Sequence, residues 1–152
     1  MLRISKADFD LIRWEAERSY PRECCGVLLG TPSAGQRAVT LTLSCENARS
    51  GSPGTRYRIK PEQVLAALKL AHNRGETIIG FYHSHPDHPP AYSSSDFADA
   101  HWFDCSYLIT SVEHGRATHT ASFVLLGSED KKQFQAEDIE IFGYSQPLRI
   151  AL

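Results

Sequence analysis

Two segments of the chain repeat their apolar residues every three to four positions, which is the period of an α-helix. In the first segment the apolar face runs from Phe9 to Tyr20, Ser5 precedes it as a capping residue, and Pro21 ends it. In the second segment the apolar stripe falls between residues 61 and 75, with a proline at its start and a glycine at its end. We therefore expect two amphipathic helices, each with one face on a core.

Shorter apolar or alternating runs predict strands. Val39 and Leu41, for example, alternate with polar residues as in a strand that is buried on one face. The expected strands span residues 24–30, 38–45, 77–82, 107–112, 120–126 and 139–142, with a further short strand at 57–59. Turn-rich composition predicts loops at 30–36 and 47–55, and the pattern at 93–101 predicts a short third helix.

The order of these elements indicates one α/β domain with a mostly antiparallel or mixed sheet and helices packed on it. A length of 152 residues suits one domain, which we expect at residues 1–145, with 146–152 as a C-terminal tail. Hydrophobic residues make up 41% and charged residues 22%, so disorder is not expected. A net charge of -2 without clustered Lys or Arg argues against nucleic-acid binding. No apolar run approaches the roughly 20 residues of a membrane span, so no membrane partner is expected.

The cysteines point to a reducing compartment. Cys24, Cys25, Cys45 and Cys105 form no C-x-x-C pair, which disfavours a structural zinc site built from cysteines. A chain of this length does not need disulfides for stability. The first ten residues carry charges and lack the apolar centre of a signal peptide. We expect reduced thiols and a cytoplasmic protein.

The most informative stretch is Gly-Phe-Tyr-His-Ser-His-Pro at residues 80–86. Side chains alternate along a strand, so His83 and His85 are expected on one face. Ile79 and Phe81 precede them on that face. The two histidines are then roughly 7 Å apart at the backbone, near enough for both imidazoles to lean onto one cation. Such a pair leaves a metal site in need of a third ligand.

Asp96 is the candidate third ligand, because it falls in the first turn of the helix after the proline loop, where the helix dipole favours a carboxylate. Two histidines and one aspartate leave the fourth zinc position open, as in catalytic sites. Glu23, at the mouth of the strand at 24–30, is the candidate general base. Ser93 is the candidate hydroxyl that donates a hydrogen bond to a developing oxyanion. Ser-x-x-Asp is also a helix-capping pattern, and the two roles are compatible.

Together these residues resemble a known signature. Glu23, the run His-Ser-His-Pro at 83–86, seven residues after His85, and then Ser93-x-x-Asp96 are similar to the motif of JAMM (MPN+) metalloproteases. The sequence Pro-Arg-Glu-Cys-Cys-Gly around Glu23 resembles the small stand-alone prokaryotic branch. Tyr92 departs from the pattern, since the family often has proline there.

The resemblance implies the JAMM/MPN architecture, a curved mixed β-sheet flanked by helices that is similar to cytidine deaminases. It implies one Zn²⁺ per chain, bound by His83, His85 and Asp96. Glu23 would then act as the general acid/base, and Ser93 would assist the oxyanion. The implied reaction is hydrolysis of the peptide or isopeptide bond after the Gly-Gly tail of a ubiquitin-like sulfur-carrier protein. A second copy of the chain could pair on an exposed strand edge, but nothing in the sequence requires it.

Two other interpretations stay open. His83-x-His85-x-Asp87-His88 is also similar to the signature of the metallo-β-lactamase superfamily, although those folds are larger and need further ligands downstream. Domains of the same shape that have lost the metal serve as interaction scaffolds, but every ligand type is present here. His88 could line a substrate entrance. The other histidines are expected in ordinary positions, namely His72, His101, His114 and His119.

Overall fold

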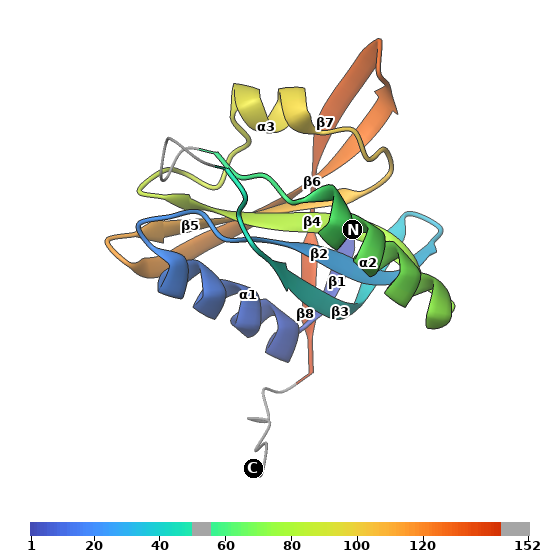
Figure 1. Ribbon diagram of the computed structural model, residues 1–152, viewed down its shortest axis with the longest axis horizontal. Coiled ribbons are helices and arrows are strands. Elements are labelled where there is room, and N and C mark those ends of the chain that lie inside the picture. Colours follow the sequence, from blue (N-terminus) through green and yellow to red (C-terminus); the bar gives the residue numbers. More distant parts are fainter. Residues whose placement is uncertain (50–55, 144–152) are drawn as a thin grey trace.

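The computed structural model describes residues 1–49 and 56–143 (Figure 1). Most of the predicted loop at 47–55 and the whole predicted tail at 146–152 lie outside the described residues. Along the chain the elements are β1 (Leu2–Ser5), α1 (Lys6–Ser19), β2 (Cys25–Ser33), β3 (Gln36–Cys45), α2 (Pro61–Asn73), β4 (Thr77–Pro86), α3 (Ser94–Asp99), β5 (Ser106–Glu113), β6 (Arg116–Ser128), β7 (Lys131–Glu137) and β8 (Ile139–Phe142).

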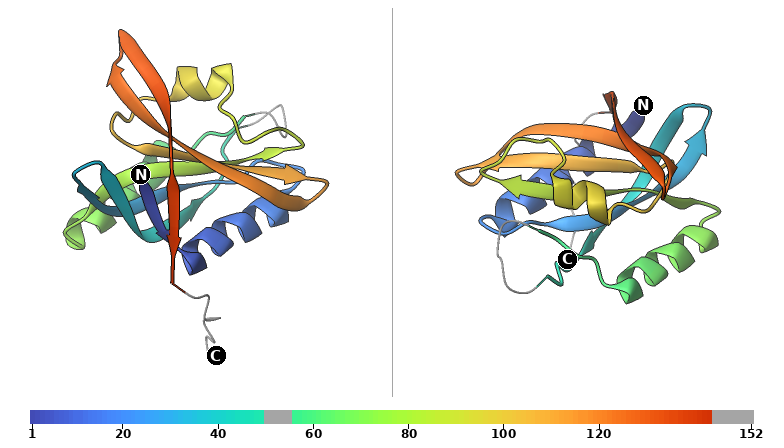
Figure 2. Two further views of the ribbon diagram at one scale, coloured as in Figure 1. Left: turned by 180° about the vertical axis from the view of Figure 1, so that it is seen from behind. Right: turned by 90° about the horizontal axis from the view of Figure 1, so that it is seen from above.

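These strands form one sheet in the order β7-β6-β5-β4-β2-β3-β1-β8. β4 pairs with β5 in parallel, and β1 is parallel to both β3 and β8, whereas the other neighbours are antiparallel. The views of Figure 2 show a strongly curled sheet with α1 on one side and α2 on the other. The prediction of one α/β domain with a curved mixed sheet and flanking helices is therefore confirmed.

The face of the sheet under α1 is closed by an apolar core. Ile12 and Ala16 of α1 pack there with Leu28 of β2 and Tyr82 of β4. Burying a large apolar side chain contributes about 1.5–3 kcal/mol, so these contacts hold α1 in place. The helix begins where the sequence predicts, because Ser5 Oγ accepts a hydrogen bond of 3.0 Å from the backbone N–H three residues on.

The opposite face carries α2 and a second core, to which Ala71 of α2 and Phe81 of β4 contribute. β4 therefore gives Phe81 to one core and Tyr82 to the other, as strand alternation requires. His83 and His85 continue the series of Phe81. The strand thus delivers both imidazoles to the face shared with α2, beyond the apolar core.

The sequence predicts Ile79 on the same face of β4 as Phe81, and this prediction is wrong. Ile79 belongs to the core under α1, while its neighbour Ile78 belongs to the core under α2. The cause is a bulge, because Leu28 pairs with Gly80 but Leu29 pairs with Ile78, so that Ile79 is the extra residue. Strict alternation holds only on the C-terminal side of the bulge, which is the part that carries the histidines.

Other segments also differ from the sequence-based expectation. Residues 30–36, predicted as a loop, extend β2 and β3 into a hairpin with Gly35 at its turn, where a φ of 74° suits glycine. Residues 57–59, predicted as a short strand, do not form one. β1 was not predicted because it has only four residues, and β7 because its sequence KKQFQAE is mostly polar, as an edge strand allows.

A buried polar cluster joins strands that are far apart in the sheet order. Arg37 of β3 forms an ion pair with Glu137 at the end of β7, and its Nε donates a hydrogen bond of 2.6 Å to Ser106 Oγ. Glu137 also accepts a hydrogen bond of 2.8 Å from Ser122 Oγ and lies 3.2 Å from the amino group of Met1. Burial alone would raise the pKa of the Glu137 carboxyl, but contacts with Ser106, Ser122 and Arg37 hold it below its ordinary value. We call these five residues the Glu137 cluster.

Among the described residues, no helix reaches the length and apolar character that crossing a membrane requires.

Candidate metal centre

The two histidines of β4 converge on one point. His83 Nε2 and His85 Nε2 lie 3.1 Å apart, and the residues are only 1% and 7% exposed. At this level β4 lies between β2 and β5, with His83 opposite Cys25 on one side and Ile109 on the other. The imidazole pair is therefore positioned by a central strand of the sheet.

Asp96 meets the histidines from α3. Its Oδ1 lies 3.3 Å from His83 Nε2, and its Oδ2 lies 3.1 Å from His85 Nε2. The same carboxylate belongs to a capping box, in which Asp96 Oδ2 accepts a hydrogen bond of 2.7 Å from the backbone N–H of Ser93 and Ser93 Oγ accepts one of 3.1 Å from the backbone N–H of Asp96. Capping thus orients the carboxylate toward the histidines.

The electrostatics of the three groups favour an ionised aspartate. Burial would raise the pKa of Asp96, but hydrogen bonds with His83 and His85 lower it well below its ordinary value. Burial lowers the pKa of His83, which favours the neutral imidazole. Burial would also lower the pKa of His85, but contacts with Asp96 and with the carbonyl of Pro89 outweigh it and raise that pKa.

Contacts behind each ring orient the imidazoles. His85 Nδ1 lies 2.9 Å from the carbonyl oxygen of Pro89, so an N–H there would leave Nε2 free as an acceptor or ligand. Tyr57 stacks on His83, with ring centroids 4.3 Å apart and an angle of 23° between the planes. His83 Nδ1 is buried and has no hydrogen-bond partner in the described part of the chain.

Glu23 lies beside the histidines, just before β2, and is 4% exposed. Its ligand atom and those of His83 and His85 all lie within 4.8 Å of one another. Its Oε2 is buried without a hydrogen-bond partner among residues 1–49 and 56–143. Burial raises the pKa of Glu23 to about 7, which is the range in which a carboxylate exchanges protons at neutral pH.

A cavity of about 360 Å³ opens onto this group of residues. Glu23, His85 and Ser93 line it, and His88 and Tyr92 form part of its wall. His88, which the sequence offered as a residue near a substrate entrance, and Tyr92, which departs from the family pattern, both line this cavity. An external substrate can reach the side chains through this cavity.

The donor set fits a divalent metal. Zinc bound tetrahedrally at about 2.0–2.1 Å holds its ligand atoms about 3.3 Å apart. The separations among His83, His85 and Asp96 are 3.1, 3.1 and 3.3 Å. Two imidazoles and a carboxylate are ligand types that zinc accepts, and a buried Glu23 oxygen without a partner faces the same place.

The comparisons with known proteins agree with this geometry. A family model described as prokaryotic homologues of the JAB domain matches residues 5–126. The chain belongs to this JAB-domain family. The match confirms the resemblance to JAMM (MPN+) proteins on which the sequence-based expectations of fold and site rested.

Two curated relatives of this JAB-domain protein match about two thirds of the chain. The desampylase of Haloferax volcanii is 38% identical over 98 residues, which cover 64% of this chain and 68% of that protein. A probable TtuB-protein conjugate cleaving protease of Thermus thermophilus is 34% identical over 100 residues, which cover 66% of this chain and 63% of that protein. The match therefore spans less than two thirds of the second relative.

A solved structure supports the fold. A JAB1/MPN domain protein from Archaeoglobus fulgidus superposes with a TM-score of 0.55 at 15% sequence identity, and the match covers 94% of this chain and 98% of that chain. At this identity the likeness concerns the fold alone. It agrees with the curled mixed sheet of this JAB-domain protein.

The structure brings together the predicted site residues, namely Glu23, His83, His85, Ser93 and Asp96. It does not bring together the residues of the metallo-β-lactamase-like run. Asp87, the aspartate of the metallo-β-lactamase-like run, is turned away, because its carboxylate accepts hydrogen bonds from Tyr20 Oη at 2.7 Å and from the backbone N–H of His114 at 2.9 Å. Two neighbours of the site were not predicted, namely Tyr57 and Asn47. Neither belongs to a motif, and only the fold of residues 46–49 and 56–60 places them here.

Proposed function

We propose that this JAB-domain protein is a zinc-dependent peptidase or isopeptidase that cleaves the bond after the Gly-Gly tail of a ubiquitin-like sulfur-carrier protein. The observation that carries the proposal is the convergence of His83, His85 and Asp96 within 3.3 Å of one another beside a buried Glu23. A structural metal site would be closed, whereas this group of residues opens onto a cavity.

In the proposed site, His83 and His85 bind one Zn²⁺ through Nε2 and Asp96 binds it through its carboxylate. When bound, the zinc ion supplies Lewis acidity, which polarises the scissile carbonyl and makes water acidic enough to lose a proton near neutral pH. The Pro89 carbonyl, 2.9 Å from His85 Nδ1, keeps the other nitrogen of that ring free for binding.

Glu23 moves the proton. Its carboxylate takes a proton from the attacking water and later gives it to the nitrogen of the leaving amine. Hydrolysis then balances, because the acyl carbon gains the hydroxyl of one water, the C–N bond breaks, and the leaving nitrogen gains the proton. A pKa raised to about 7 by burial suits both directions of this transfer.

Ser93 stabilises the negative oxygen that develops on the substrate. Its Oγ accepts a hydrogen bond from the N–H of Asp96, which uses the oxygen but not the hydroxyl proton. That proton is available for donation into the cavity that Ser93 lines. Capping of α3 and catalysis thus use different parts of one hydroxyl group.

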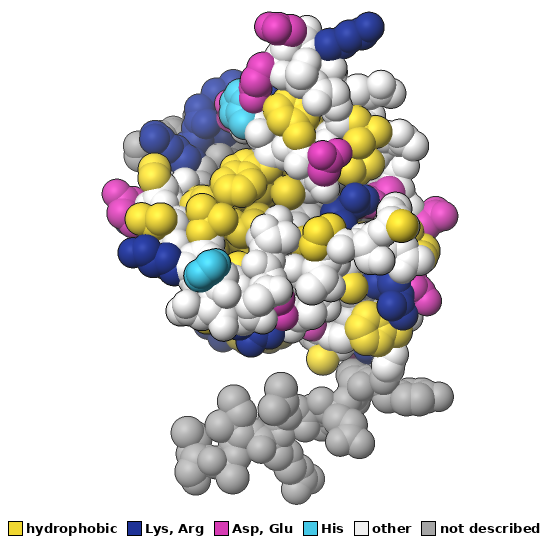
Figure 3. Space-filling view, turned by 90° about the vertical axis from the view of Figure 1, so that its right-hand side faces the viewer, with side chains coloured by type: hydrophobic (Ala, Val, Ile, Leu, Met, Phe, Trp, Pro, Cys, Tyr) yellow, Lys and Arg dark blue, Asp and Glu magenta, His cyan; other side chains and the backbone are white. Residues whose placement is uncertain are grey.

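The acyl part of the substrate lies, in this proposal, along an apolar groove next to the centre. The groove encloses about 560 Å³. Its apolar wall includes Tyr57, Val64, Phe81 and Trp102, and Arg49, Arg58, Asp99 and His101 also line it. The space-filling view from the α2 side shows a broad hydrophobic area at the middle of that face (Figure 3). A tail of two glycines is thin enough for a narrow groove, and the names of the two curated relatives support a protein conjugate as the substrate.

The cytoplasm is the proposed location, since all four cysteines are free thiols and burial raises the pKa of Cys24 to about 11 and of Cys105 to about 11. Such thiols are unreactive and suit a reducing compartment.

The experiment that tests the proposal uses zinc-loaded protein and sulfur-carrier proteins extended past Gly-Gly, with mass spectrometry of the products. Trimming after Gly-Gly that stops on chelation and returns with zinc supports the proposal. A protein that binds no zinc, even after refolding with it, is a metal-free scaffold instead.

A further inference from the structure

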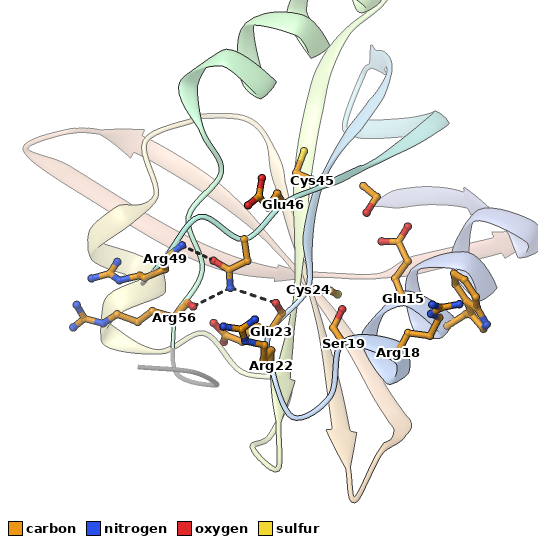
Figure 4. A pocket seen from close by; sticks show the side chains of 13 residues that line it. Glu15, Arg18, Ser19, Arg22, Glu23, Cys24, Cys45, Glu46, Arg49 and Arg56 are labelled. Carbon is orange, nitrogen blue, oxygen red and sulfur yellow. Dashed lines mark hydrogen bonds between the residues drawn. The ribbon is translucent and has the colours of Figure 1, made fainter. Parts of the chain in front are cut away.

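A second cavity of about 550 Å³ is also lined by Glu23, and it shares Arg49 with the apolar groove. It lies between the end of α1, the segment before β2 and the segment that follows β3 (Figure 4). Four of its lining residues are arginines: Arg18, Arg22, Arg49 and Arg56. We call this cavity the arginine pocket.

One side chain ties the arginine pocket to the proposed general base. Asn47 Nδ2 donates hydrogen bonds to the carbonyl oxygens of Glu23 (3.3 Å) and Arg56 (3.2 Å). Asn47 Oδ1 accepts hydrogen bonds from the backbone N–H of Arg49 (3.1 Å) and Arg58 (3.0 Å). The arginines after β3 are therefore held to the backbone of Glu23 by a side chain with all of its hydrogen-bonding groups in use.

None of the acidic residues of the pocket forms an ion pair with these arginines among the described residues. Glu15 accepts a hydrogen bond of 2.6 Å from Tyr82 Oη, and Glu46 pairs with Lys60 at 3.0 Å. Arg22 and Arg56 are exposed and form no ion pair within the described part of the chain.

The other two arginines have partners, but their guanidinium groups make no short ion pair among the described residues. Arg49 Nη1 lies 3.8 Å from Asp99 Oδ2, which is the longest Lys or Arg ion pair of the described residues. Arg18 stacks on Trp14, with its Cζ 4.8 Å from the ring centroid. The guanidinium groups of the pocket therefore retain donors for a ligand. Because guanidinium groups bind carboxylates in a bidentate manner, an anionic ligand of this class fits the pocket.

The position of the pocket relative to Glu23 assigns its occupant, and this step rests on the proposed function. Glu23 lines both the cavity at the metal centre and the arginine pocket, but it does not line the apolar groove. In the proposed reaction Glu23 protonates the leaving amine. The leaving group therefore passes Glu23 into the arginine pocket, while the acyl part stays on the side of the groove.

We propose that the arginine pocket selects leaving groups that carry carboxylates, which Arg22 and Arg56 bind with support from Arg49. The carboxylate can be the free C-terminus of a short leaving peptide or the side chains of an acidic segment. Both sources present the same chemistry to the guanidinium groups, and the substrates below separate them.

The test compares four sulfur-carrier substrates that differ only after Gly-Gly. The leaving peptide is neutral with a C-terminal amide, neutral with a free carboxylate, acidic with an amide, or basic with an amide. Charge-assisted hydrogen bonds predict a kcat/KM about tenfold higher for a carboxylate-bearing substrate than for the neutral amide, and a basic substrate below both. Preference for the free carboxylate alone identifies a C-terminal occupant, and preference for acidic side chains identifies an internal segment.

The variant Arg22→Gln/Arg56→Gln locates the effect. It should bring the ratio of acidic to neutral kcat/KM to within about twofold of unity. The control Arg74→Gln/Arg116→Gln removes two exposed positive charges elsewhere and should keep the tenfold ratio. Equal rates on acidic and neutral substrates, or a ratio that survives Arg22→Gln/Arg56→Gln, would overturn the proposal.

A binding measurement separates this proposal from the proposed function. Fluorescence anisotropy of a labelled acidic peptide should show binding to the wild-type protein and about tenfold weaker binding to Arg22→Gln/Arg56→Gln. Cleavage of no substrate together with this binding pattern would refute the peptidase but keep the pocket. Cleavage without any charge preference, and without binding of the acidic peptide, would refute the pocket but keep the peptidase.

Discussion

Two buried polar clusters in the described part of the protein differ in how completely their atoms are bonded. In the Glu137 cluster, the carboxylate of Glu137 forms ion pairs with Arg37 and the amino group of Met1 and accepts a hydrogen bond from Ser122. In the candidate metal centre, two imidazole nitrogens face each other at 3.1 Å, and His83 Nδ1 and Glu23 Oε2 have no hydrogen-bond partner in the part of the chain described.

This difference indicates that the Glu137 cluster stabilises the fold, whereas the candidate metal centre is arranged to bind a ligand. A buried polar group without a partner costs about 1–3 kcal/mol, so a fold keeps such groups only where something else compensates. The Glu137 cluster is closed and links β3 with β7 across the curl of the sheet. The metal centre is open, and it lies beside a cavity. Substitutions in the two clusters should therefore have opposite effects on stability and activity.

The largest expected effect comes from removing a proposed ligand. His83→Ala should bind no zinc and should show only background cleavage, because two ligands cannot retain the ion against a chelator. Metal content by mass spectrometry and product analysis check both results. His72→Ala, at the exposed end of α2, is the matched control and should keep zinc and activity. Full zinc content in His83→Ala would contradict the proposed ligand set.

Removing the proposed general base should separate binding from catalysis. Glu23→Gln should keep zinc but lose about 10²–10⁴-fold in kcat, because the amide can neither take nor return the proton. In the wild type, kcat/KM should rise as the pH passes about 7, where Glu23 loses its proton. Normal turnover in Glu23→Gln, with zinc bound, would remove Glu23 from the mechanism.

The hydroxyl of Ser93 should contribute less than the base. Ser93→Ala should lower kcat by about 10²–10³-fold through loss of one oxyanion donor, and it should cost about 1 kcal/mol of stability through loss of the cap on α3. Ser93→Thr retains a hydroxyl and should recover most of both. Thermal unfolding and steady-state kinetics measure the two effects. A Ser93→Ala enzyme with lowered stability but unchanged kcat would leave only the capping role.

The closed cluster should respond in the opposite way. Glu137→Gln should lower stability by about 3 kcal/mol, since it leaves the charge of Arg37 buried without its partner, and it should not change zinc content. The folded-state pKa of Glu137 is depressed, so the carboxylate stabilises the protein above its unfolded pKa, and this contribution disappears as the pH falls through the lower folded value. The stability difference between wild type and Glu137→Gln should therefore be largest near pH 7 and should shrink at acidic pH, as urea unfolding across pH would show. A difference independent of pH would contradict this account of the cluster.

The two clusters also differ in how far the sequence predicts them. His83, His85, Asp96 and Ser93 lie within one short stretch, so strand alternation and the signals of a helix start were enough to place them together. Glu23 is predicted from its position at the mouth of the strand at 24–30, and the family resemblance agrees with that choice. The Glu137 cluster joins Arg37 to Glu137, 100 positions further along the chain, and only the curl of the sheet brings them into contact.

The same distinction explains the remaining differences. The helix α1 carries its signals locally, in Ser5 and in the apolar face, and was predicted with its boundaries nearly correct. The bulge at Ile79 depends on pairing with β2, and the contact of Tyr57 with His83 depends on how the segment before α2 folds over β4. Periodicity within one element does not contain that information.

The most direct test of the central claim is X-ray absorption of the zinc-loaded native protein, with the metal content measured on the same sample. The account predicts one zinc per chain, with two imidazole nitrogens and carboxylate oxygen at about 2.0–2.2 Å and no sulfur. A protein that takes up no zinc, or a zinc ion with sulfur at about 2.3 Å from the nearby Cys24 or Cys25, would contradict it.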